Sequence, residues 1–363
     1  MVRCLVVDDS ALMRQFIRRS LAERGIQVVG VARNGEEAVS GVLHLLPDVV
    51  TLDVNMPVLD GLAALRQIMA SRPTPVVMVS QLTAREAPAS IEALASGAVD
   101  VVAKPEASTR DPSALARFAD ELARKVRIAA RARPRPVSSG PQAFAPPKPQ
   151  KPFKSPAASA DPRVRPPLVV IGSSTGGPAA LCELFASLDP VLLPSPVIVV
   201  QHMPAGFTRS LAERLDSLSP LHVREAENGA ALRPGEVLVA PGGFHLLIRS
   251  GGLSVSLDDS PPRQHVRPSV DVTLESAARH YPGPVVAVIL TGMGSDGALG
   301  ARLVRARGGR VIVQDESTSA IYGMPRAVVE QGDADLVCPL PEIATALVQT
   351  VTTLNYSGRG NYE

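Results

Sequence analysis

Short apolar runs alternate with amphipathic stretches over the first 130 residues. The runs occur at 4–7, 28–31, 48–52, 76–79 and 99–102. The stretches between them, for example 11–24 and 91–96, carry apolar residues at helical spacing. Five strands that alternate with five helices predict a doubly wound α/β domain with a five-stranded parallel sheet.

The same alternation returns between residue 168 and about residue 350. Apolar runs occur at 168–172, 196–201, 236–240, 284–290 and 310–313, and helical patterns at 178–187, 207–217, 270–280, 297–307 and 341–350. The segment 244–257 has two central glycines and predicts a β-hairpin. We therefore expect a second α/β domain with a parallel sheet and a β-hairpin addition.

The segment between the two halves has a different composition. Residues 131–167 are rich in Pro, Ala, Ser and Lys and show no sustained apolar period. Such a segment cannot bury a core, so we expect a Pro-rich flexible linker. The predicted boundaries are a first domain at 1–130, the linker at 131–167, a second domain at 168–352 and a tail at 353–363.

Composition and charge narrow the class of protein. The chain has 363 residues, 45% of them hydrophobic, 3% aromatic and none of them Trp, so the cores must be built from Val, Leu, Ile and Ala. A net charge of +2 argues against nucleic-acid binding by the whole protein. Three widely spaced cysteines favour a reducing compartment. With neither a signal peptide nor a membrane-spanning apolar run, we expect a cytoplasmic protein.

Polar side chains follow the apolar runs of the first half. Asp8 and Asp9 follow the first run, Asp53 the third, Ser80 the fourth and Lys104 the fifth. The carboxyl ends of parallel strands form binding sites, and three aspartates brought together there favour Mg²⁺. A carboxylate beside Mg²⁺ and a lysine can accept a phosphoryl group. Asp53, the central one, is the best candidate.

These residues resemble the receiver domain of two-component response regulators. The matching positions are Asp8-Asp9, Asp53-x-Asn55-Met56-Pro57-x-x-Asp60-Gly61, Ser80 and Lys104-Pro105. The resemblance implies that a histidine kinase phosphorylates Asp53. It also implies that Asp9, Asp53 and the Asn55 backbone carbonyl hold Mg²⁺ with the help of Asp8, and that Ser80 and Lys104 grip the phosphoryl group. Val101 stands where receivers generally have Phe or Tyr, so the aromatic residue of their usual switch is absent at this position.

A glycine-rich turn opens the second half. Gly172-Ser173-Ser174-Thr175-Gly176 lies between an apolar strand pattern and a helical pattern. The G-x-S-x-G spacing singles out Ser174 as a nucleophile with small neighbours and a helix start beside it. A loop that binds phosphate or merely closes a tight turn remains an alternative for the motif alone.

A serine nucleophile needs a base and an orienting carboxylate. His202 directly follows the apolar strand pattern 197–200, and Asp296 lies between glycines after the pattern 285–290. An N-cap role for Asp296 stays open beside the catalytic one. The chain order Ser, His, Asp differs from the Ser, acid, His order of α/β-hydrolases and argues against that fold.

Together these segments resemble the catalytic domain of chemotaxis protein-glutamate methylesterases, the CheB family. The matching segments are 171–178, 201–204, 240–245, 267–271 and 290–298. The resemblance implies hydrolysis of γ-glutamyl methyl esters on chemoreceptors and, in many members, deamidation of receptor glutamines. Ser174 would be the nucleophile, His202 the base and then acid, and Asp296 the orienting carboxylate. The Met293 backbone N–H would stabilise the oxyanion with Thr175 in support, and ester hydrolysis would need no cofactor.

The resemblance also implies regulation and partners. The unphosphorylated receiver would cover the active site, and phosphorylation of Asp53 would expose Ser174. The expected partners are methyl-accepting chemoreceptors as substrate and a chemotaxis histidine kinase as phosphodonor. No nucleic-acid partner is expected, and contact with membranes is expected only indirectly, through the receptors. Two alternatives remain: a phosphorylation-controlled docking protein without hydrolysis, and an esterase of the same fold acting on another substrate.

Overall fold

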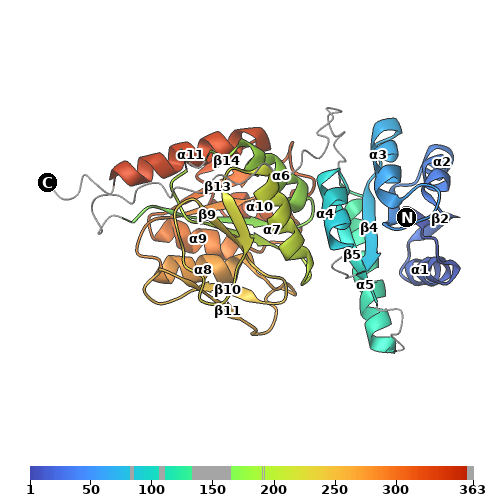
Figure 1. The fold of residues 1–363 in the computed structure, drawn as a ribbon, viewed down its shortest axis with the longest axis horizontal. Helices are drawn as coiled ribbons and strands as arrows, with labels where there is room; N and C mark the ends of the chain where they lie inside the picture. The colour runs from blue at the N-terminus through green and yellow to red at the C-terminus, as the bar shows by residue number, and fades with distance from the viewer. Residues whose placement is uncertain (82–85, 106–110, 133–164, 190, 192, 358–363) are drawn as a thin grey trace. The chain divides into compact units, whose positions relative to one another are not determined.

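The computed structural model describes residues 1–81, 86–105, 111–132, 165–189, 191 and 193–357, which belong to two compact units (Figure 1). Each unit is considered by itself. Most of the predicted linker and the last residues of the predicted tail lie outside the described residues. The predicted domain boundaries therefore stay predictions. Among the described helices, none is long and apolar enough to cross a membrane.

The first unit is built on a parallel sheet of five strands in the order β2-β1-β3-β4-β5. Its elements are β1 Arg3–Val7, α1 Ala11–Glu23, β2 Gln27–Ala32, α2 Gly35–Leu45, β3 Val49–Asp53, α3 Gly61–Ser71, β4 Val76–Gln81, α4 Ala87–Ala95, β5 Asp100–Lys104 and α5 Pro112–Ala129. The central strand β3 is buried along its whole length, as expected for a sheet covered by helices on both faces. The predicted five-stranded doubly wound domain is confirmed.

The loop after β3 is fixed by a cap and a glycine. The Asp60 side chain accepts a hydrogen bond from the Ala63 N–H at 2.8 Å and so starts α3. A Cβ on Gly61 would overlap the Asp53 carbonyl oxygen. Only glycine can therefore occupy this position, and the tight fit holds the Asp53 main chain against the start of α3.

The second unit is built on a parallel sheet of seven strands in the order β14-β13-β12-β6-β7-β9-β8. Its elements are β6 Leu168–Ser173, α6 Gly177–Ser187, β7 Val197–Gln201, α7 Phe207–Leu218, β8 His222–Glu225, β9 Glu236–Val239, β10 His245–Ile248, β11 Val255–Asp258, α8 Val270–His280, β12 Val285–Ile289, α9 Ala298–Ala306, β13 Arg310–Gln314, α10 Met324–Glu330, β14 Leu336–Cys338 and α11 Leu340–Ser357. The predicted hairpin is the antiparallel pair β10–β11.

The edges of this sheet differ from the prediction. The short edge strands β8 and β14 and the short helix α10 were not predicted, because segments of three to seven residues carry too little periodicity. Helix α11 continues to Ser357, past the predicted tail boundary at 353. The apolar spacing of Leu347, Val351 and Leu354 explains this extension, since these residues recur along one face of the helix.

The order of the strands determines where a site can form. From β6 the chain moves to β7 on one side, and it later returns to place β12 on the other side. In open parallel sheets such a reversal of strand order leaves a crevice at the carboxyl ends of the strands. Ser174 follows β6, His202 follows β7 and Asp296 follows β12. The three predicted residues therefore come from three adjacent strands.

Candidate active site and phosphorylation site

The turn between β6 and α6 distinguishes two neighbouring serines. Ser173 is fully buried, and its Oγ donates a hydrogen bond to Gln201 Oε1 at 2.7 Å. Ser174 is half-buried, and its main chain is held by a hydrogen bond from its N–H to the Thr291 carbonyl at 3.0 Å. Gly176 then adopts φ +78°, which favours glycine, and α6 begins. Ser174 is thus the accessible hydroxyl of the turn.

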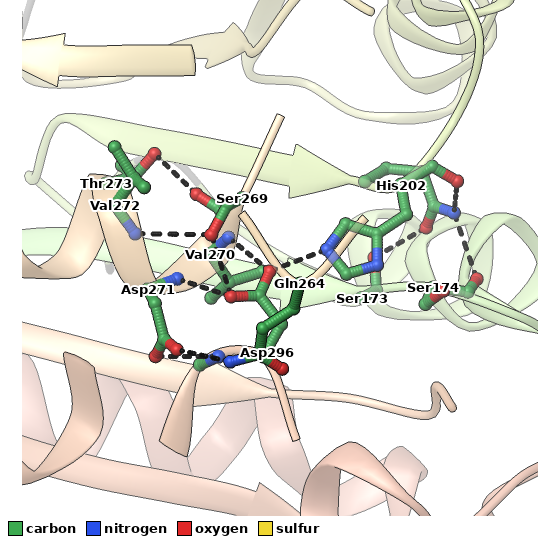
Figure 2. A network of polar contacts seen from close by, with 12 residues as sticks. Ser173, Ser174, His202, Gln264, Ser269, Val270, Asp271, Val272, Thr273 and Asp296 are labelled. Carbon is green, nitrogen blue, oxygen red and sulfur yellow. Dashed lines mark hydrogen bonds and ion pairs between the residues drawn. The ribbon is translucent and has the colours of Figure 1, made fainter. Parts of the chain in front are cut away.

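His202 and Asp296 are joined by a short hydrogen bond. The Nε2 atom of His202 lies 2.7 Å from Asp296 Oδ2. Figure 2 marks this contact with a dashed line. An ionised carboxylate can only accept, so Nε2 carries the proton and Nδ1 is left as the acceptor of the neutral ring. The atom of His202 that is available as a general base is therefore Nδ1.

The Asp296 carboxylate is buried and saturated with donors. Besides His202 it accepts hydrogen bonds from Ser269 Oγ at 2.8 Å, Val270 N–H at 2.7 Å and Asp271 N–H at 3.0 Å (Figure 2). Burial alone would raise its pKa, but the hydrogen bond from His202, the charge that this ring carries when it is protonated, and the two N–H groups hold the pKa below its ordinary value. Asp296 is thus kept ionised beside His202.

The capping role foreseen for Asp296 is real, but it serves a different helix. Its own helix, α9, begins after Gly297, which makes no side-chain cap. The carboxylate instead accepts from Val270 and Asp271 in the first turn of α8. Asp296 therefore fixes α8 and orients His202 with the same two oxygens.

Asp271, in the first turn of α8, caps the start of α9 in the same way. Its Oδ1 accepts hydrogen bonds from Gly297 N–H at 2.9 Å and Gly300 N–H at 2.8 Å. Burial raises the pKa of Asp271 to about 6. No role for Asp271 could be predicted from sequence, because its local pattern does not indicate which helix it caps. The loop that carries Met293 and Asp296 is thus anchored at its end by two reciprocal caps.

Thr175 follows Ser174 in the same turn, and Met293 lies in the loop after β12, which is joined to that turn by the Ser174–Thr291 hydrogen bond. Residue 292 must be glycine, because a Cβ there would lie 2.8 Å from the Ser174 Cβ and would also overlap Met324. Met293, the next residue, is 45% exposed, and over the described part of the chain its N–H has no hydrogen-bond acceptor. Thr175 is buried, and its carbonyl accepts from Thr291 Oγ1 at 3.0 Å.

The predicted acidic cluster assembles at the carboxyl end of the first sheet. One carboxylate oxygen from each of Asp8, Asp9 and Asp53 lies within 4.8 Å of the others. The Nζ atom of Lys104 lies 2.9 Å from Asp8 Oδ2 and 2.8 Å from Asp53 Oδ1. This set of oxygen donors fits Mg²⁺, which prefers carboxylate and carbonyl ligands.

Burial sets the electrostatics of this cluster. It raises the pKa of Asp53 to about 6, although Lys104 pulls in the other direction. Burial lowers the pKa of Lys104, but the charges of Asp53 and Asp8 outweigh this and leave the pKa above its ordinary value. Asp53 is therefore a buried carboxylate whose charge Lys104 offsets only in part, and Lys104 is a permanent positive charge.

The Ser80 hydroxyl is hydrogen-bonded to Glu86, a residue that sequence reasoning missed. Ser80 Oγ donates to Glu86 Oε2 at 3.1 Å, and Asn55 Nδ2 donates to Glu86 Oε1 at 2.8 Å. Glu86 lies directly before α4, beyond a loop that is outside the described residues. Ser80 Oγ can donate a hydrogen bond to a phosphoryl group only if its hydrogen bond to Glu86 breaks. Val101, at the usual aromatic position, is buried in β5.

The fold and the two sites define a response-regulator receiver joined to a hydrolase domain. A family model described as "Response regulator receiver domain" matches residues 4–114, and one described as "CheB methylesterase" matches residues 169–347. The chain belongs to the CheB family of protein-glutamate methylesterases/protein-glutamine glutaminases. The family and fold class predicted from sequence are confirmed.

Relatives of this name match along almost the whole chain. A protein-glutamate methylesterase/protein-glutamine glutaminase from Symbiobacterium thermophilum is 51% identical over 96% of this chain and 97% of its own length. One from Thermotoga maritima is 45% identical over 96% of this chain and 98% of its own. The crystal structure of the Thermotoga maritima CheB methylesterase catalytic domain is 49% identical, with a TM-score of 0.50, and covers 51% of this chain and 99% of that domain.

Proposed function

We propose that this protein hydrolyses glutamate γ-methyl esters on methyl-accepting chemoreceptors, and deamidates receptor glutamines, under the control of receiver phosphorylation. The observation that carries the proposal is the 2.7 Å hydrogen bond between His202 and Asp296 at the strand ends flanking the serine turn. In a chain of this family, that pair supplies the base and the orienting carboxylate of a Ser-His-Asp mechanism.

The mechanism follows from the position of each group. Ser174 Oγ attacks the ester carbonyl carbon while His202 Nδ1 takes its proton, and Asp296 stabilises the imidazolium through Nε2–H. The Met293 N–H stabilises the oxyanion, a contribution of about 3 kcal/mol for one donor. Methanol leaves with the proton from His202, and water then hydrolyses the acyl-enzyme by the same steps. Ammonia takes the place of methanol when the substrate is glutamine.

The direct test is methanol release from membranes that contain methylated receptors, with and without a small phosphodonor. We expect release that rises with the phosphodonor and disappears in Ser174→Ala. Binding to receptors without release would indicate the docking protein. Release from other acyl esters but not from receptors would indicate an esterase with a different substrate.

For the receiver, we propose that Asp9, Asp53 and the Asn55 backbone carbonyl hold Mg²⁺ with the help of Asp8. Bound Mg²⁺ would neutralise charge on the transferring phosphoryl group. Asp53 would accept that group from a chemotaxis histidine kinase, and Lys104 and Ser80 would bind its oxygens. We place the reaction in the cytoplasm as part of the same proposal.

Mg²⁺ is expected to raise the melting temperature of the first unit. The carboxylates of Asp8, Asp9 and Asp53 repel one another, so a cation that binds only the folded state stabilises it by about 1.4 kcal/mol at ten times its Kd. Calorimetry with Mg²⁺ and with EDTA measures the shift. Asp9→Ala is the matched control, because Asp9 is exposed and makes no ion pair with Lys104 in the described structure. An equal rise in melting temperature with Mg²⁺ in Asp9→Ala would show that the ion binds at another site.

Asp53→Ala is expected to leave methanol release at the unphosphorylated level and insensitive to phosphodonor. The reason is that the variant lacks the acceptor carboxylate, while the serine site in the second unit is unchanged. Methanol release from receptor membranes is measured with and without phosphodonor. Strong activation of Asp53→Ala would contradict the assignment, and Asp60→Ala, which loses only the cap of α3, controls for damage to the loop.

A further inference from the structure

Gln201 connects the two strand ends that carry the proposed nucleophile and base. It is the last residue of β7 and only 2% exposed. Its Oε1 accepts a hydrogen bond from Ser173 Oγ at 2.7 Å, and its Nε2 donates to the Ser174 carbonyl at 2.9 Å and the His202 carbonyl at 3.1 Å. One side-chain amide thus contacts the main chain of both residues.

The start of α6 is shaped to admit this amide. A Cβ on Gly177 would overlap Gln201 Oε1 and would lie 2.9 Å from the Ser173 Cβ. Glycine at position 177 therefore leaves the space that the amide fills. With Ser173 holding Oε1, the Nε2 end of the amide faces the two carbonyls.

The amide acts where the strand ladder ends. The last ladder hydrogen bond between β6 and β7 runs from His202 N–H to the Ser173 carbonyl at 3.1 Å. The Ser174 and His202 carbonyls lie beyond it, at the residues whose side chains must meet. A misplacement of about 1 Å between reacting groups can lower a rate about 100-fold. Fixing both carbonyls to one rigid amide limits such displacement.

We propose that Gln201 is a positioning residue that sets the separation between Ser174 Oγ and His202 Nδ1. This inference rests on the proposed Ser-His-Asp function. It differs from a purely structural role, in which a buried amide only stabilises the packing of β6 and β7. A structural role predicts a lower melting temperature and an unchanged site in the folded protein. A positioning role predicts a changed site in protein that is fully folded.

Gln201→Leu in the full-length chain tests the proposal, because leucine has a similar volume and no hydrogen-bonding groups. We expect kcat for methanol release to fall about 30- to 100-fold below the melting temperature, with KM within about twofold. Ser276→Ala is the control: it removes a buried hydroxyl that ties α8 to Ile248 in β10 and touches neither Ser174 nor His202. This control is expected to lose stability and keep kcat.

A second readout does not depend on turnover. The His202 Nε2 proton, held at 2.7 Å by Asp296, should give a low-field proton resonance in NMR spectra. We expect it to shift or broaden in Gln201→Leu and to stay unchanged in Ser276→Ala. A resonance and kcat equal to wild type in folded Gln201→Leu would overturn the proposal. If Ser174→Ala still released methanol, the proposed mechanism would fail. The His202 resonance would still test whether Gln201 positions His202.

Ser173→Ala is a milder variant than Gln201→Leu, because it removes one hydrogen bond of the amide instead of three. It deletes only the hydrogen bond that fixes Oε1 and leaves both carbonyl contacts of Nε2 in place. We expect a fall in kcat of about three- to tenfold and a smaller change of the same resonance. No change in either quantity in Ser173→Ala would count against the proposal, even if Gln201→Leu did not fold.

Discussion

Replacing Ser174 with alanine is expected to lower methanol release by a factor on the order of 10⁶, as removal of a catalytic serine does elsewhere. The variant keeps the His202–Asp296 pair but has no hydroxyl to attack the ester. What activity remains comes from the oxyanion donor and substrate binding. Methanol release per enzyme, measured after phosphodonor treatment, gives the factor.

The neighbouring Ser173 provides the control for this experiment. Both variants remove one hydroxyl from the same turn, but Ser173 is buried and bonded to Gln201, whereas Ser174 is half-buried. We expect Ser173→Ala to keep at least a tenth of the activity. Equal losses in the two variants would mean that the turn as a whole matters and that Ser174 is not the nucleophile.

Asp296→Asn is expected to lower kcat about 10⁴-fold and also to destabilise the second unit. An amide at this position can donate to His202 through its nitrogen, which would put the ring proton on Nδ1, the atom that must accept from Ser174. The amide also offers fewer acceptor sites to Ser269, Val270 and Asp271. Loss of this cap should cost about 1 kcal/mol of unfolding free energy.

Urea unfolding and kcat separate the two effects. Asp216→Asn is a matched control, because Asp216 in α7 also accepts a backbone N–H, from Val223 in β8 at 2.7 Å, and lies outside the site. It should lose comparable stability and keep kcat within about twofold. A similar loss of kcat in the control would show that the fall in Asp296→Asn reports instability.

Much of both sites could be read from sequence because most of their residues end or directly follow apolar strands, and Asp296 lies in the loop after β12. In a parallel sheet the carboxyl ends of neighbouring strands meet, so Asp8, Asp9 and Asp53 were expected together, as were Ser174, His202 and Asp296. The fold supplies proximity, and the residue types supply the chemistry. The two parallel sheets followed from the alternation of apolar runs with helical patterns, except for the short edge strands β8 and β14, and the hairpin followed from its two central glycines.

The residues that support the sites were not assigned from sequence. Gln201 belongs to the matching segment 201–204 but was given no role there, and Glu86 belongs to none of the motifs. Their partners are fixed by loop paths and side-chain directions that no local pattern encodes. One signal was present for Gln201: a polar residue that ends a fully apolar strand must find a buried partner. Gln314 is a related case: it follows the buried apolar residues 311–313 of β13 and accepts a hydrogen bond from the Thr291 N–H at 2.7 Å.

The cap that Asp296 provides to α8 has an evolutionary consequence. A descendant that abandoned hydrolysis through Ser174→Ala would lose only a partly exposed hydroxyl and would remain a well-folded pseudoenzyme, still able to dock and to be phosphorylated. Loss through Asp296 would also leave three further donors without their acceptor. We therefore expect inactive descendants of this architecture to have changed the serine and to have kept the aspartate.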